Sequence, residues 1–273
     1  MPEVRGYSKL DQPEILGLLF HPRLDDTCPA SAGVVDFDIA VAVGVILAAR
    51  FHLADVAAPN IIFFHGNGET VADYDEIGGM YTARGVSFLI VDYRGYGRSS
   101  GRPTASNMLA DSHVVLREVK SWLAGEQRTG PLIVMGRSLG SACAIELAAV
   151  EQSGIAALII ESGFAETKPL LANLGIDVDG LGFTEADGFG NAEKIACCTK
   201  PTLILHAQQD EIIPAVSAEI LQANSGARSK EFLVIPCAGH NNILEHTGPL
   251  YFEVISRFAR KIAGVRERSR SRR

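Results

Sequence analysis

Six short runs of apolar residues constrain the fold of this chain more than any other feature of its sequence. They read "NIIFFHG", "VSFLIVDY", "PLIVMG", "AALIIES", "PTLILHA" and "EFLVIPC". Each run is rich in valine, isoleucine, leucine and phenylalanine, and none alternates between apolar and polar residues. A strand that is apolar on both faces belongs in a parallel sheet with helices packed on each side. The runs therefore predict the central strands of such a sheet.

The segments between these runs carry helical patterns, and the alternation of strand and helix predicts a doubly wound α/β fold with right-handed crossovers. An antiparallel pair, "VVDFDIAV" and "VILAARFHLA", precedes the six runs, so we expect a mostly parallel sheet of about eight strands. The expected helices span residues 69–84, 107–124, 138–151, 216–223 and 242–262. At 273 residues the chain is long for one domain, but α/β folds of about 250 residues are common as single units.

Residues 163–200 break this rhythm of strands and helices. The segment is rich in glycine and aspartate, and its helical pattern is weak. Long inserts of this kind in a compact domain are usually functional loops. We therefore predict one α/β domain at residues 35–262, with residues 163–200 forming a small cap over the carboxyl edge of the sheet. Residues 1–34 are interpreted as an N-terminal extension, and residues 263–273 as a basic, disordered tail.

The charge balance argues against a nucleic-acid partner. The formal net charge is −7, so the body of the protein offers no positive footprint for a polynucleotide. The tail is the exception, since five of the last eight residues are arginine. Like charges repel and nothing apolar lies beside them, so we expect this tail to be solvated. Weak contact of the tail with a membrane surface is the most that we predict.

Cysteine usage and the absence of apolar targeting segments predict a cytoplasmic protein. The five cysteines are odd in number and show no CxxC spacing, which favours neither a disulfide framework nor a zinc site. The N-terminus lacks an apolar stretch behind a basic start, and no window of about 18 residues is apolar without charge. We therefore expect no signal peptide, no membrane-spanning helix, no metal and no cofactor.

The run "PLIVMG" leads directly into Gly136-Arg137-Ser138-Leu139-Gly140, which fits the pattern G-x-S-x-G. In open α/β sheets, ligands bind outside the carboxyl ends of the strands. Glycines at such a corner permit a strained nucleophile and leave room for the helix that follows. A dinucleotide-binding loop would need G-x-G-x-x-G and a phosphate loop would need G-K-[ST], and neither is present. The corner therefore predicts Ser138 as a nucleophile.

A serine hydroxyl needs a base to activate it, and the base needs an acid to orient it. Asp210 follows the run "PTLILHA", and His240 follows "EFLVIPC". With Ser138 they come from the carboxyl ends of three different strands, so their side chains can converge. The order serine, aspartate, histidine differs from the orders in chymotrypsin and subtilisin. Glu161, at the end of another strand, is the alternative to Asp210.

An oxyanion needs two preorganised donors beside the nucleophile. The backbone N–H of Leu139, which follows Ser138, is the first candidate. The turn "HGNGE" follows the run "NIIFF", and the backbone N–H of Asn67 within it is the second candidate. The alternative interpretation of this turn is a simple glycine-rich corner. Arg137, beside the nucleophile, either pairs with a carboxylate or faces the pocket.

In combination, the segments "FFHGNGE", "VDYRGYGRSSG", "GRSLGSACAIELA", "HAQQDEIIP" and "GHNN" resemble the serine-hydrolase branch of the α/β-hydrolase superfamily. More narrowly, they are similar to the small-capped α/β-hydrolase-domain proteins. The resemblance implies the α/β-hydrolase fold, the triad Ser138–Asp210–His240 and an oxyanion hole at Asn67 and Leu139. In such folds the loop "VDYRGYGRSSG" is a structural brace. The resemblance does not indicate which substrate the protein uses.

These features together predict a serine hydrolase that cleaves a carboxylic ester or thioester through an acyl-enzyme on Ser138. Its partner is then a small-molecule acyl substrate, and no cofactor takes part. Two alternatives remain: an amide or peptide hydrolase of the same fold, and a non-catalytic homologue that binds a ligand. The sequence predicts no oligomeric state.

Overall fold

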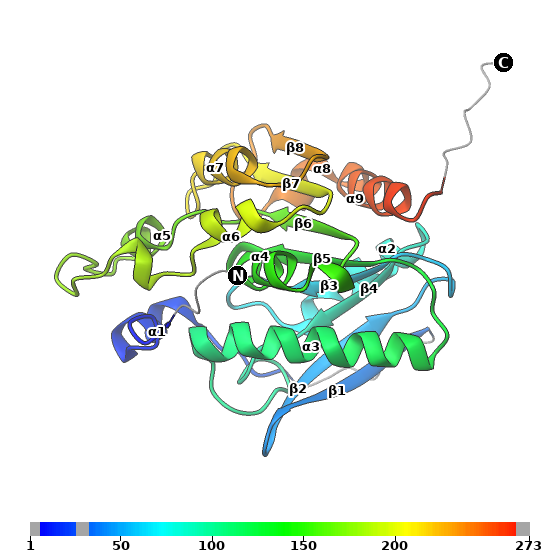
Figure 1. Cartoon of the computed structure of the whole chain (residues 1–273), viewed down its shortest axis with the longest axis horizontal. Helices are drawn as coiled ribbons and strands as arrows, with labels where there is room; N and C mark the ends of the chain where they lie inside the picture. Colours follow the sequence, from blue (N-terminus) through cyan, green and yellow to red (C-terminus); the bar gives the residue numbers. More distant parts are fainter. Residues whose placement is uncertain (1–5, 26–32, 266–273) are drawn as a thin grey trace.

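The computed structural model describes residues 6–25 and 33–265 of the chain, and within them a single eight-stranded sheet (Figure 1). Its strands are β1 (Val34–Ala42), β2 (Val45–His52), β3 (Asn60–Phe64), β4 (Ser87–Val91), β5 (Leu132–Arg137), β6 (Ala157–Glu161), β7 (Thr202–Ala207) and β8 (Lys230–Ile235). The order across the sheet is β1-β2-β4-β3-β5-β6-β7-β8. β2 pairs antiparallel with both neighbours, and all pairings from β4 to β8 are parallel. The predicted doubly wound, mostly parallel sheet is confirmed.

The central strands are buried on both faces, as their apolar runs predict. All five residues of β3 are buried. Ile62 and Phe64 belong to one hydrophobic core, whereas Ile61 and Phe63 belong to another on the opposite face. Because successive side chains of a strand point to opposite faces, a fully apolar strand needs a helical layer on each side.

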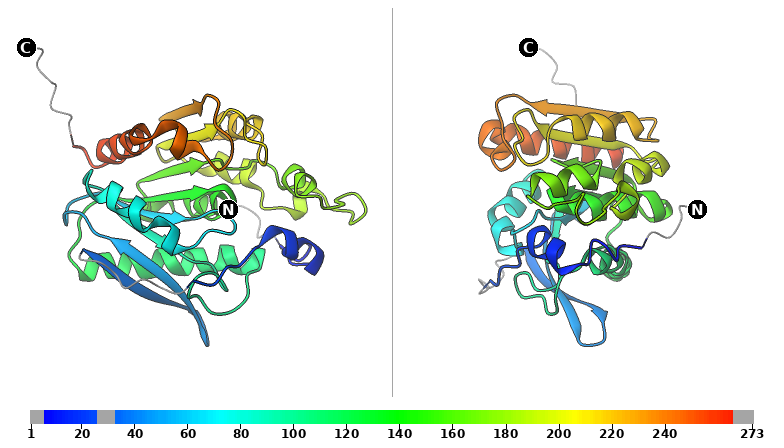
Figure 2. Two further views of the ribbon diagram at one scale, coloured as in Figure 1. Left: turned by 180° about the vertical axis from the view of Figure 1, so that it is seen from behind. Right: turned by 90° about the vertical axis from the view of Figure 1, so that its left-hand side faces the viewer.

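The two helical layers lie on opposite sides of the sheet (Figure 2). Helices α3 (Ala105–Gly125), α4 (Ser141–Val150), α6 (Asn191–Cys197) and α7 (Val216–Asn224) contribute to the first core. Helices α2 (Asp75–Thr82), α8 (Ile243–Thr247) and α9 (Pro249–Ile262) contribute to the second. The carboxyl ends of the parallel strands are therefore the open edge at which loops can form a site.

The C-terminal helical pattern departs from its prediction. A single helix was expected over residues 242–262, and this is wrong, because α8 and α9 are separate helices. Gly248 lies between them with a φ of 51°, which an α-helix does not contain. Pro249 then begins α9, a position where its missing N–H costs nothing.

Two segments outside the regular alternation also contain short helices. Residues 163–200 contain α5 (Thr167–Asn173) as well as α6, and residues 6–25 contain α1 (Pro13–Leu19). α6 packs against α4 and α7, so the end of the segment belongs to a helical layer. α1 and α5 both lie at one end of the molecule (Figures 1 and 2). That residues 163–200 act as a cap stays a prediction, and most of the predicted basic tail, residues 266–273, lies outside the described residues.

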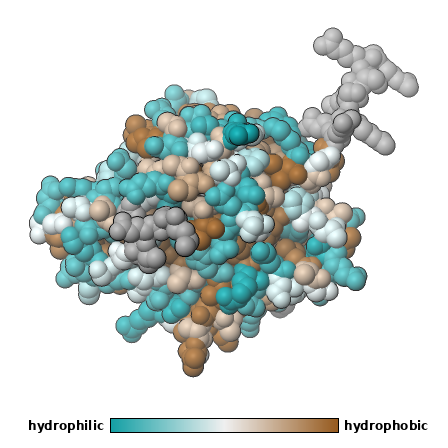
Figure 3. Space-filling view, viewed as in Figure 1, coloured by the Kyte–Doolittle hydropathy of each residue, from teal (hydrophilic) through white to brown (hydrophobic). Residues whose placement is uncertain are grey.

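The hairpin of β1 and β2 projects from the body at the bottom of Figure 1, and its tip is hydrophobic (Figure 3). Val43 at the turn is fully exposed and Ile46 is 46% exposed. The tip lies at the edge of the sheet that carries β1, whereas Ser138 lies at the end of the central strand β5.

Three further features of the described part bear on the predicted partners. None of its helices has both the length and the apolar character needed to cross a membrane. The same residues contain no group of three or more histidine, cysteine, aspartate or glutamate side chains arranged to hold a metal ion. Cys143, Cys197, Cys198 and Cys237 are unpaired thiols.

Candidate active site

Ser138 lies at a strained corner between β5 and the short 3₁₀ helix η2 (Ser138–Gly140), which leads into α4. Its φ is 52°, a left-handed conformation that costs a non-glycine residue roughly 1–3 kcal/mol. A Cβ on Gly140 would overlap the carbonyl oxygen of Phe64 on β3, and a Cβ on Gly136 would overlap the carbonyl oxygen of Gly140. Both glycines are therefore needed for the close approach that holds Ser138 at the carboxyl edge of the sheet.

His240 and Asp210 lie beside Ser138, although 30 residues or more separate each from the next along the chain. His240 follows β8, and Asp210 follows β7. His240 Nε2 lies 2.9 Å from Ser138 Oγ, and His240 Nδ1 lies 2.7 Å from Asp210 Oδ2. All three residues are buried. The structure thus brings the three predicted side chains into one hydrogen-bonded chain of hydroxyl, imidazole and carboxylate.

Asp210 is held in place by the backbone that follows it. Its Oδ1 accepts from the N–H groups of Ile212 at 3.1 Å and Ile213 at 2.7 Å. Burial raises the pKa of Asp210, but the hydrogen bond and charge of His240 outweigh it and leave the pKa below its ordinary value. His206 Nε2 lies 3.5 Å from Asp210 Oδ2, and burial lowers the pKa of this second imidazole. Asp210 is therefore an ionised carboxylate oriented toward His240.

Arg137, the residue before Ser138, contacts the turn after β3, the end of β6 and the loop after β8. Its Nη2 donates to the carbonyl oxygen of His240 at 2.9 Å and to Asn241 Oδ1 at 3.0 Å. Its Nη1 pairs with Glu69, and its Nε lies 3.4 Å from Glu161 Oε1. Burial lowers the pKa of Arg137, but the two carboxylates raise it above its ordinary value. Both interpretations left open by the sequence hold, because Arg137 pairs with two carboxylates and also lines the cavity that contains Ser138.

Glu161, the alternative acid, takes another role. Its Oε2 accepts from the hydroxyl of Tyr251 at 2.6 Å, and its Oε1 faces Arg137. Burial raises the pKa of Glu161, although Arg137 and Tyr251 oppose that shift. The ring nitrogens of His240 contact Ser138 and Asp210, and neither of them contacts Glu161.

The two candidate oxyanion donors lie around the same cavity as Ser138. Asn67 and Leu139 both line it. Leu139 is the second residue of η2, where a backbone N–H has no acceptor inside the helix. The backbone N–H of Asn67 donates to no acceptor among residues 6–25 and 33–265. The two residues are therefore near the nucleophile with uncommitted donors, and their role as an oxyanion hole stays a prediction.

The cavity beside Ser138 has a volume of about 240 Å³ and is lined by both apolar and polar residues. Its apolar lining consists of Leu19, Leu139, Leu170, Leu174 and Ile212. In the described part of the chain, no aspartate or glutamate lines this cavity. Arg137 also lines the cavity, so a cationic group would find no carboxylate partner there, and a neutral group fits it better than a cationic one.

A second cavity of about 240 Å³ shares His240 and Arg137 with the first. Its wall includes Glu69 and Glu161, which both pair with Arg137. Tyr74 donates a further hydrogen bond to Glu69 at 2.6 Å. Glu69 and Glu161 of this second cavity thus share Arg137, whereas Asp73, which also lines it, pairs with Arg23.

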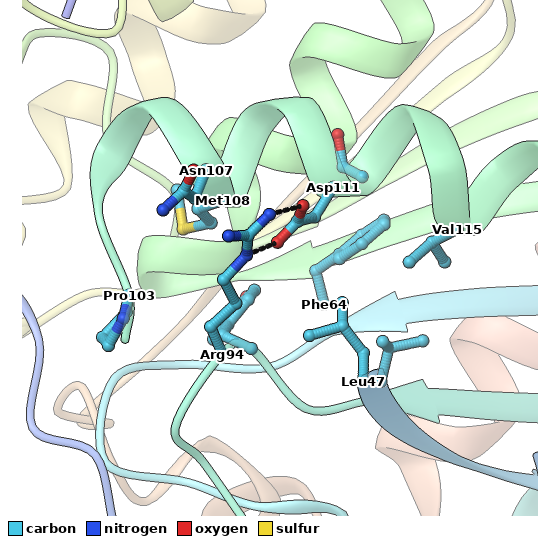
Figure 4. A pocket seen from close by; sticks show the side chains of 11 residues that line it. Leu47, Phe64, Arg94, Pro103, Asn107, Met108, Asp111 and Val115 are labelled. Carbon is cyan, nitrogen blue, oxygen red and sulfur yellow. Dashed lines mark hydrogen bonds and ion pairs between the residues drawn. The ribbon is translucent and has the colours of Figure 1, made fainter. Parts of the chain in front are cut away.

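The loop "VDYRGYGRSSG" fastens a helix to the sheet, as its interpretation as a brace predicts. Arg94 makes a two-pronged ion pair with Asp111 of α3, at 2.6 and 2.7 Å (Figure 4). Ser99 Oγ accepts from the backbone N–H of Ala48 on β2 at 2.8 Å. The adjoining cavity is only about 10 Å³, which is room for at most one water molecule.

Three residues near the triad were not predicted as parts of the site. Leu19 and His21 come from the segment interpreted as an extension, and both line the cavity of Ser138. The third is His206, which lies beside Asp210. The apolar residues of "PEILGLLF" were the one sequence feature that could have indicated α1. The sequence around an isolated histidine does not indicate which residues it will contact in the fold.

Comparisons with known proteins give the family context of this geometry. The family model described as "Serine aminopeptidase, S33" matches residues 56–178. An uncharacterised protein of Mycobacterium tuberculosis is 31% identical over 217 residues, which are 78% of this chain and 73% of that protein. Protein bem46 of Schizosaccharomyces pombe is 30% identical over 73% of this chain and 67% of its own length. The human protein "Alpha/beta hydrolase domain-containing protein 17B" is 32% identical over 67% of this chain and 60% of its own length.

Solved structures share the architecture at low sequence identity. The Pyrococcus furiosus esterase Pf2001 superimposes with a TM-score of 0.72 at 16% identity, over 90% of this chain and 99% of that one. Est1E from Butyrivibrio proteoclasticus, solved with ferulic acid bound, gives a TM-score of 0.68 at 20% identity, over 84% of this chain and 99% of that one. These likenesses concern the fold.

Proposed function

Because this chain belongs to the α/β-hydrolase superfamily, we propose that it is a serine hydrolase that cleaves a carboxylic ester or thioester through an acyl-enzyme on Ser138. One observation carries the proposal. His240 contacts Ser138 Oγ at 2.9 Å through one ring nitrogen and Asp210 at 2.7 Å through the other. Ser138 is also the strained residue of its corner and lines a cavity.

In the first half of the proposed reaction, Ser138 Oγ attacks the carbonyl carbon of the substrate while His240 Nε2 takes the hydroxyl proton. Asp210 keeps the proton of His240 on Nδ1 and stabilises the imidazolium that forms. The N–H groups of Asn67 and Leu139 bind the negative oxygen of the tetrahedral intermediate. His240 then gives its proton to the departing alcohol or thiol, and the acyl group stays on Ser138.

In the second half, a water molecule replaces the departed alcohol or thiol. His240 takes a proton from this water, and the resulting hydroxide attacks the acyl carbon. The second tetrahedral intermediate collapses when the bond to Ser138 Oγ breaks and His240 returns a proton to that oxygen. The products are a carboxylic acid and the free enzyme.

The chemistry of the cavity favours a neutral acyl group over an aminoacyl group. An aminopeptidase binds a substrate with a free ammonium group, and a buried ammonium group needs a carboxylate partner. Glu69 and Glu161 are already paired with Arg137, and no acidic residue of the described part lines the Ser138 cavity. An ester or thioester is therefore the better substrate class, with the amide hydrolase as the second candidate. The description of the matched family as serine aminopeptidase keeps that candidate open to test.

Hydrolysis of acyl substrates by matched variants tests the proposal. We expect the purified protein to hydrolyse p-nitrophenyl esters or acyl thioesters. Ser138→Ala and His240→Ala should lower kcat by about 10⁴-fold or more, as removal of triad members does elsewhere. Ser153→Ala, an exposed serine on η3 (Gln152–Gly154), is the control and should keep full activity. Full activity in Ser138→Ala would refute the assignment, and a wild-type protein that turns over neither esters, thioesters nor amides would favour a ligand-binding homologue.

We also propose that residues 163–200 cap the carboxyl edge of the sheet, where Leu170 and Leu174 line the Ser138 cavity. A cytoplasmic location is proposed as well, because the four thiols of the described residues form no disulfide and would persist in a reducing compartment. Fractionation of cells that express the tagged full-length protein tests this location.

A further inference from the structure

The N-terminal residues 6–25 are packed into the body of the protein. Leu10, Ile15 and Leu19 are almost fully buried and belong to the same hydrophobic core as α3 and α4. Phe20, directly after α1, is 4% exposed. Burial of several apolar side chains of this size stabilises the folded position of the segment. The segment is therefore a fixed element of the fold.

Polar contacts fasten the same segment to distant parts of the chain. Lys9 Nζ donates to the carbonyl oxygen of Gly182 at 2.7 Å and pairs with Asp187 at 3.0 Å. Tyr7 contributes a hydroxyl that accepts from Lys194 Nζ of α6 at 2.9 Å. Gly182 and Asp187 both belong to residues 163–200. The two segments that lie outside the strand–helix alternation thus hold each other in place.

His21, just after α1, contacts the side chain of Asn67 through two atoms. The backbone N–H of His21 donates to Asn67 Oδ1 at 2.8 Å, and His21 Nδ1 lies 2.7 Å from Asn67 Nδ2. The hydroxyl of Tyr96 also donates to Asn67 Oδ1, at 2.7 Å, and accepts from the backbone N–H of His21 at 2.9 Å. Two donors on Oδ1 fix the amide orientation, so Nδ2 is the donor and His21 Nδ1 the acceptor.

We propose that residues 6–25 complete the active site for substrates with an uncharged, apolar acyl chain. Leu19 forms a wall of the acyl pocket, and His21 is a positioning residue that holds Asn67 where its backbone N–H meets the oxyanion. The inference rests on the proposed function, since both roles presuppose that Ser138 forms an acyl-enzyme.

The positioning role follows from what an oxyanion hole requires. Its donors must already be in place when negative charge develops, because reorganisation at that moment would consume the stabilisation. Asn67 belongs to the turn between β3 and η1 (Val71–Tyr74), and the turn contains two glycines, Gly66 and Gly68. Within the turn, the Glu69 carboxylate accepts from the backbone N–H of Gly66 at 2.7 Å, but it makes no hydrogen bond with Asn67. The contacts from His21 and Tyr96 supply the restraint from outside the turn.

The specificity role follows from the lining of the cavity. Leu19 of α1 and Leu170 and Leu174 of the α5 region line the cavity of Ser138, with Ile212 from the loop after β7. At about 240 Å³, the cavity lies below the roughly 300–1,000 Å³ of pockets that enclose a whole drug-sized ligand. It therefore fits the acyl part of a substrate, and its length is set by side chains from both segments.

Variants of His21 test the positioning role, with steady-state kinetics on a short p-nitrophenyl ester. His21→Ala removes the acceptor for Asn67 Nδ2, so we expect kcat to fall about tenfold with little change in KM. The reason is that the oxyanion forms in the transition state and the tetrahedral intermediate and is absent from the bound substrate. His21→Asn places an oxygen acceptor at the position of Nδ1 and should recover most of that loss. Tyr96→Phe removes the second contact and should show the same split between kcat and KM.

The outcomes are separable from an effect on folding. Thermal unfolding midpoints of each variant report on the structure, and Tyr96→Phe keeps the buried ring even where His21→Ala unfolds. Wild-type kcat in both His21→Ala and Tyr96→Phe would overturn the positioning role. A rise in KM without a fall in kcat would also overturn it, as would a His21→Asn variant that folds but stays as slow as His21→Ala.

Variants of Leu19 test the pocket wall with a series of esters of increasing acyl length. Leu19→Ala should shift the optimum of kcat/KM toward longer chains and Leu19→Phe toward shorter ones, each changing the ratio between adjacent esters by about tenfold. Leu18→Ala is the matched control, because Leu18 lies next to Leu19 on α1, is 38% exposed and does not line the cavity. Unchanged profiles in both Leu19 variants would overturn this part. A wild-type protein without acyl hydrolysis would instead defeat the proposed function itself.

Discussion

Replacement of Arg137 by methionine is expected to destabilise the protein strongly at neutral pH. The substitution keeps an apolar stem of similar length and removes the only guanidinium that contacts both Glu69 and Glu161 in the described structure. The side chain of Arg137 is 11% exposed and that of Glu161 only 6%. Removing one partner of a buried ion pair leaves an uncompensated charge, which costs about 3–5 kcal/mol. Against a typical total stability of about 5–15 kcal/mol, this loss is large.

The loss of unfolding free energy in Arg137→Met should depend on pH, and the direction of this dependence follows from the pKa of Glu161. Burial already raises the pKa of Glu161, and removal of Arg137 takes away the charge that opposes that rise. A carboxyl whose pKa is raised by folding favours the folded state below its unfolded pKa, and this contribution disappears as the pH rises through the folded pKa. The destabilisation should therefore be greater at neutral pH than near pH 4.5, the ordinary pKa of a glutamate side chain.

Urea unfolding followed by the fluorescence of Trp122, the single tryptophan, measures this free energy. The double variant Arg137→Met with Glu161→Gln should recover part of the loss, because the amide of glutamine carries no charge. Arg137→Lys keeps the charge but loses the fork that reaches both Glu69 and the His240 carbonyl, so its stability should fall between wild type and Arg137→Met. A loss below about 1 kcal/mol in Arg137→Met, or the same loss at both pH values, would refute the reasoning.

Two further predictions concern the corner at Gly140 and the ion pair between α4 and α6. Gly140→Ala places a Cβ against the carbonyl oxygen of Phe64, so we expect a loss of about 1–3 kcal/mol in urea unfolding and a fall in kcat, whereas unchanged kinetics would contradict the tight corner. Glu146 pairs with Lys194 at 2.6 Å. Burial raises the pKa of Glu146, but His113 and Lys194 outweigh burial and lower it to about 2. A carboxyl whose pKa is lowered by folding stabilises the folded state above its unfolded pKa, and this contribution is lost as the pH falls toward about 2. The free energy of unfolding of Glu146→Gln should therefore depend less on pH in acid than that of the wild type, and an equal dependence would contradict the pairing.

The strands could be predicted from the sequence because burial on both faces leaves a local signature. Every residue of β3, β4, β5, β6 and β7 is buried, and each of these strands contains at least three consecutive apolar residues. The candidate triad residues could be singled out because each lies at or just after the end of such a strand. The corner at Ser138 adds its own signal, since its flanking glycines are required by contacts that are specific to a strand–helix turn.

The rest of the site depends on contacts between residues far apart in the chain. Nothing near His21 in the sequence indicates Asn67, which lies 46 residues away and is held by it. Arg137 likewise meets Glu69, at a separation of 68 residues, only after the sheet has formed. A seven-residue helix such as α1 shows too few turns for a clear periodicity. The break between α8 and α9 does have a local signal, because the pair Gly248-Pro249 is typical of a turn. The prediction of one continuous helix gave more weight to the helical pattern on both sides of that pair.

Activation of the Ser138 hydroxyl by His240 can be measured with a fluorophosphonate, which reacts with activated serines. After treatment of the folded protein and mass spectrometry of its peptides, we expect one phosphonylated residue, Ser138. Labelling should be abolished in Ser138→Ala and strongly slowed in His240→Ala, while Ser153→Ala is labelled at the wild-type rate. Labelling of another residue, no labelling at all, or equal labelling rates in wild type and His240→Ala would contradict this activation.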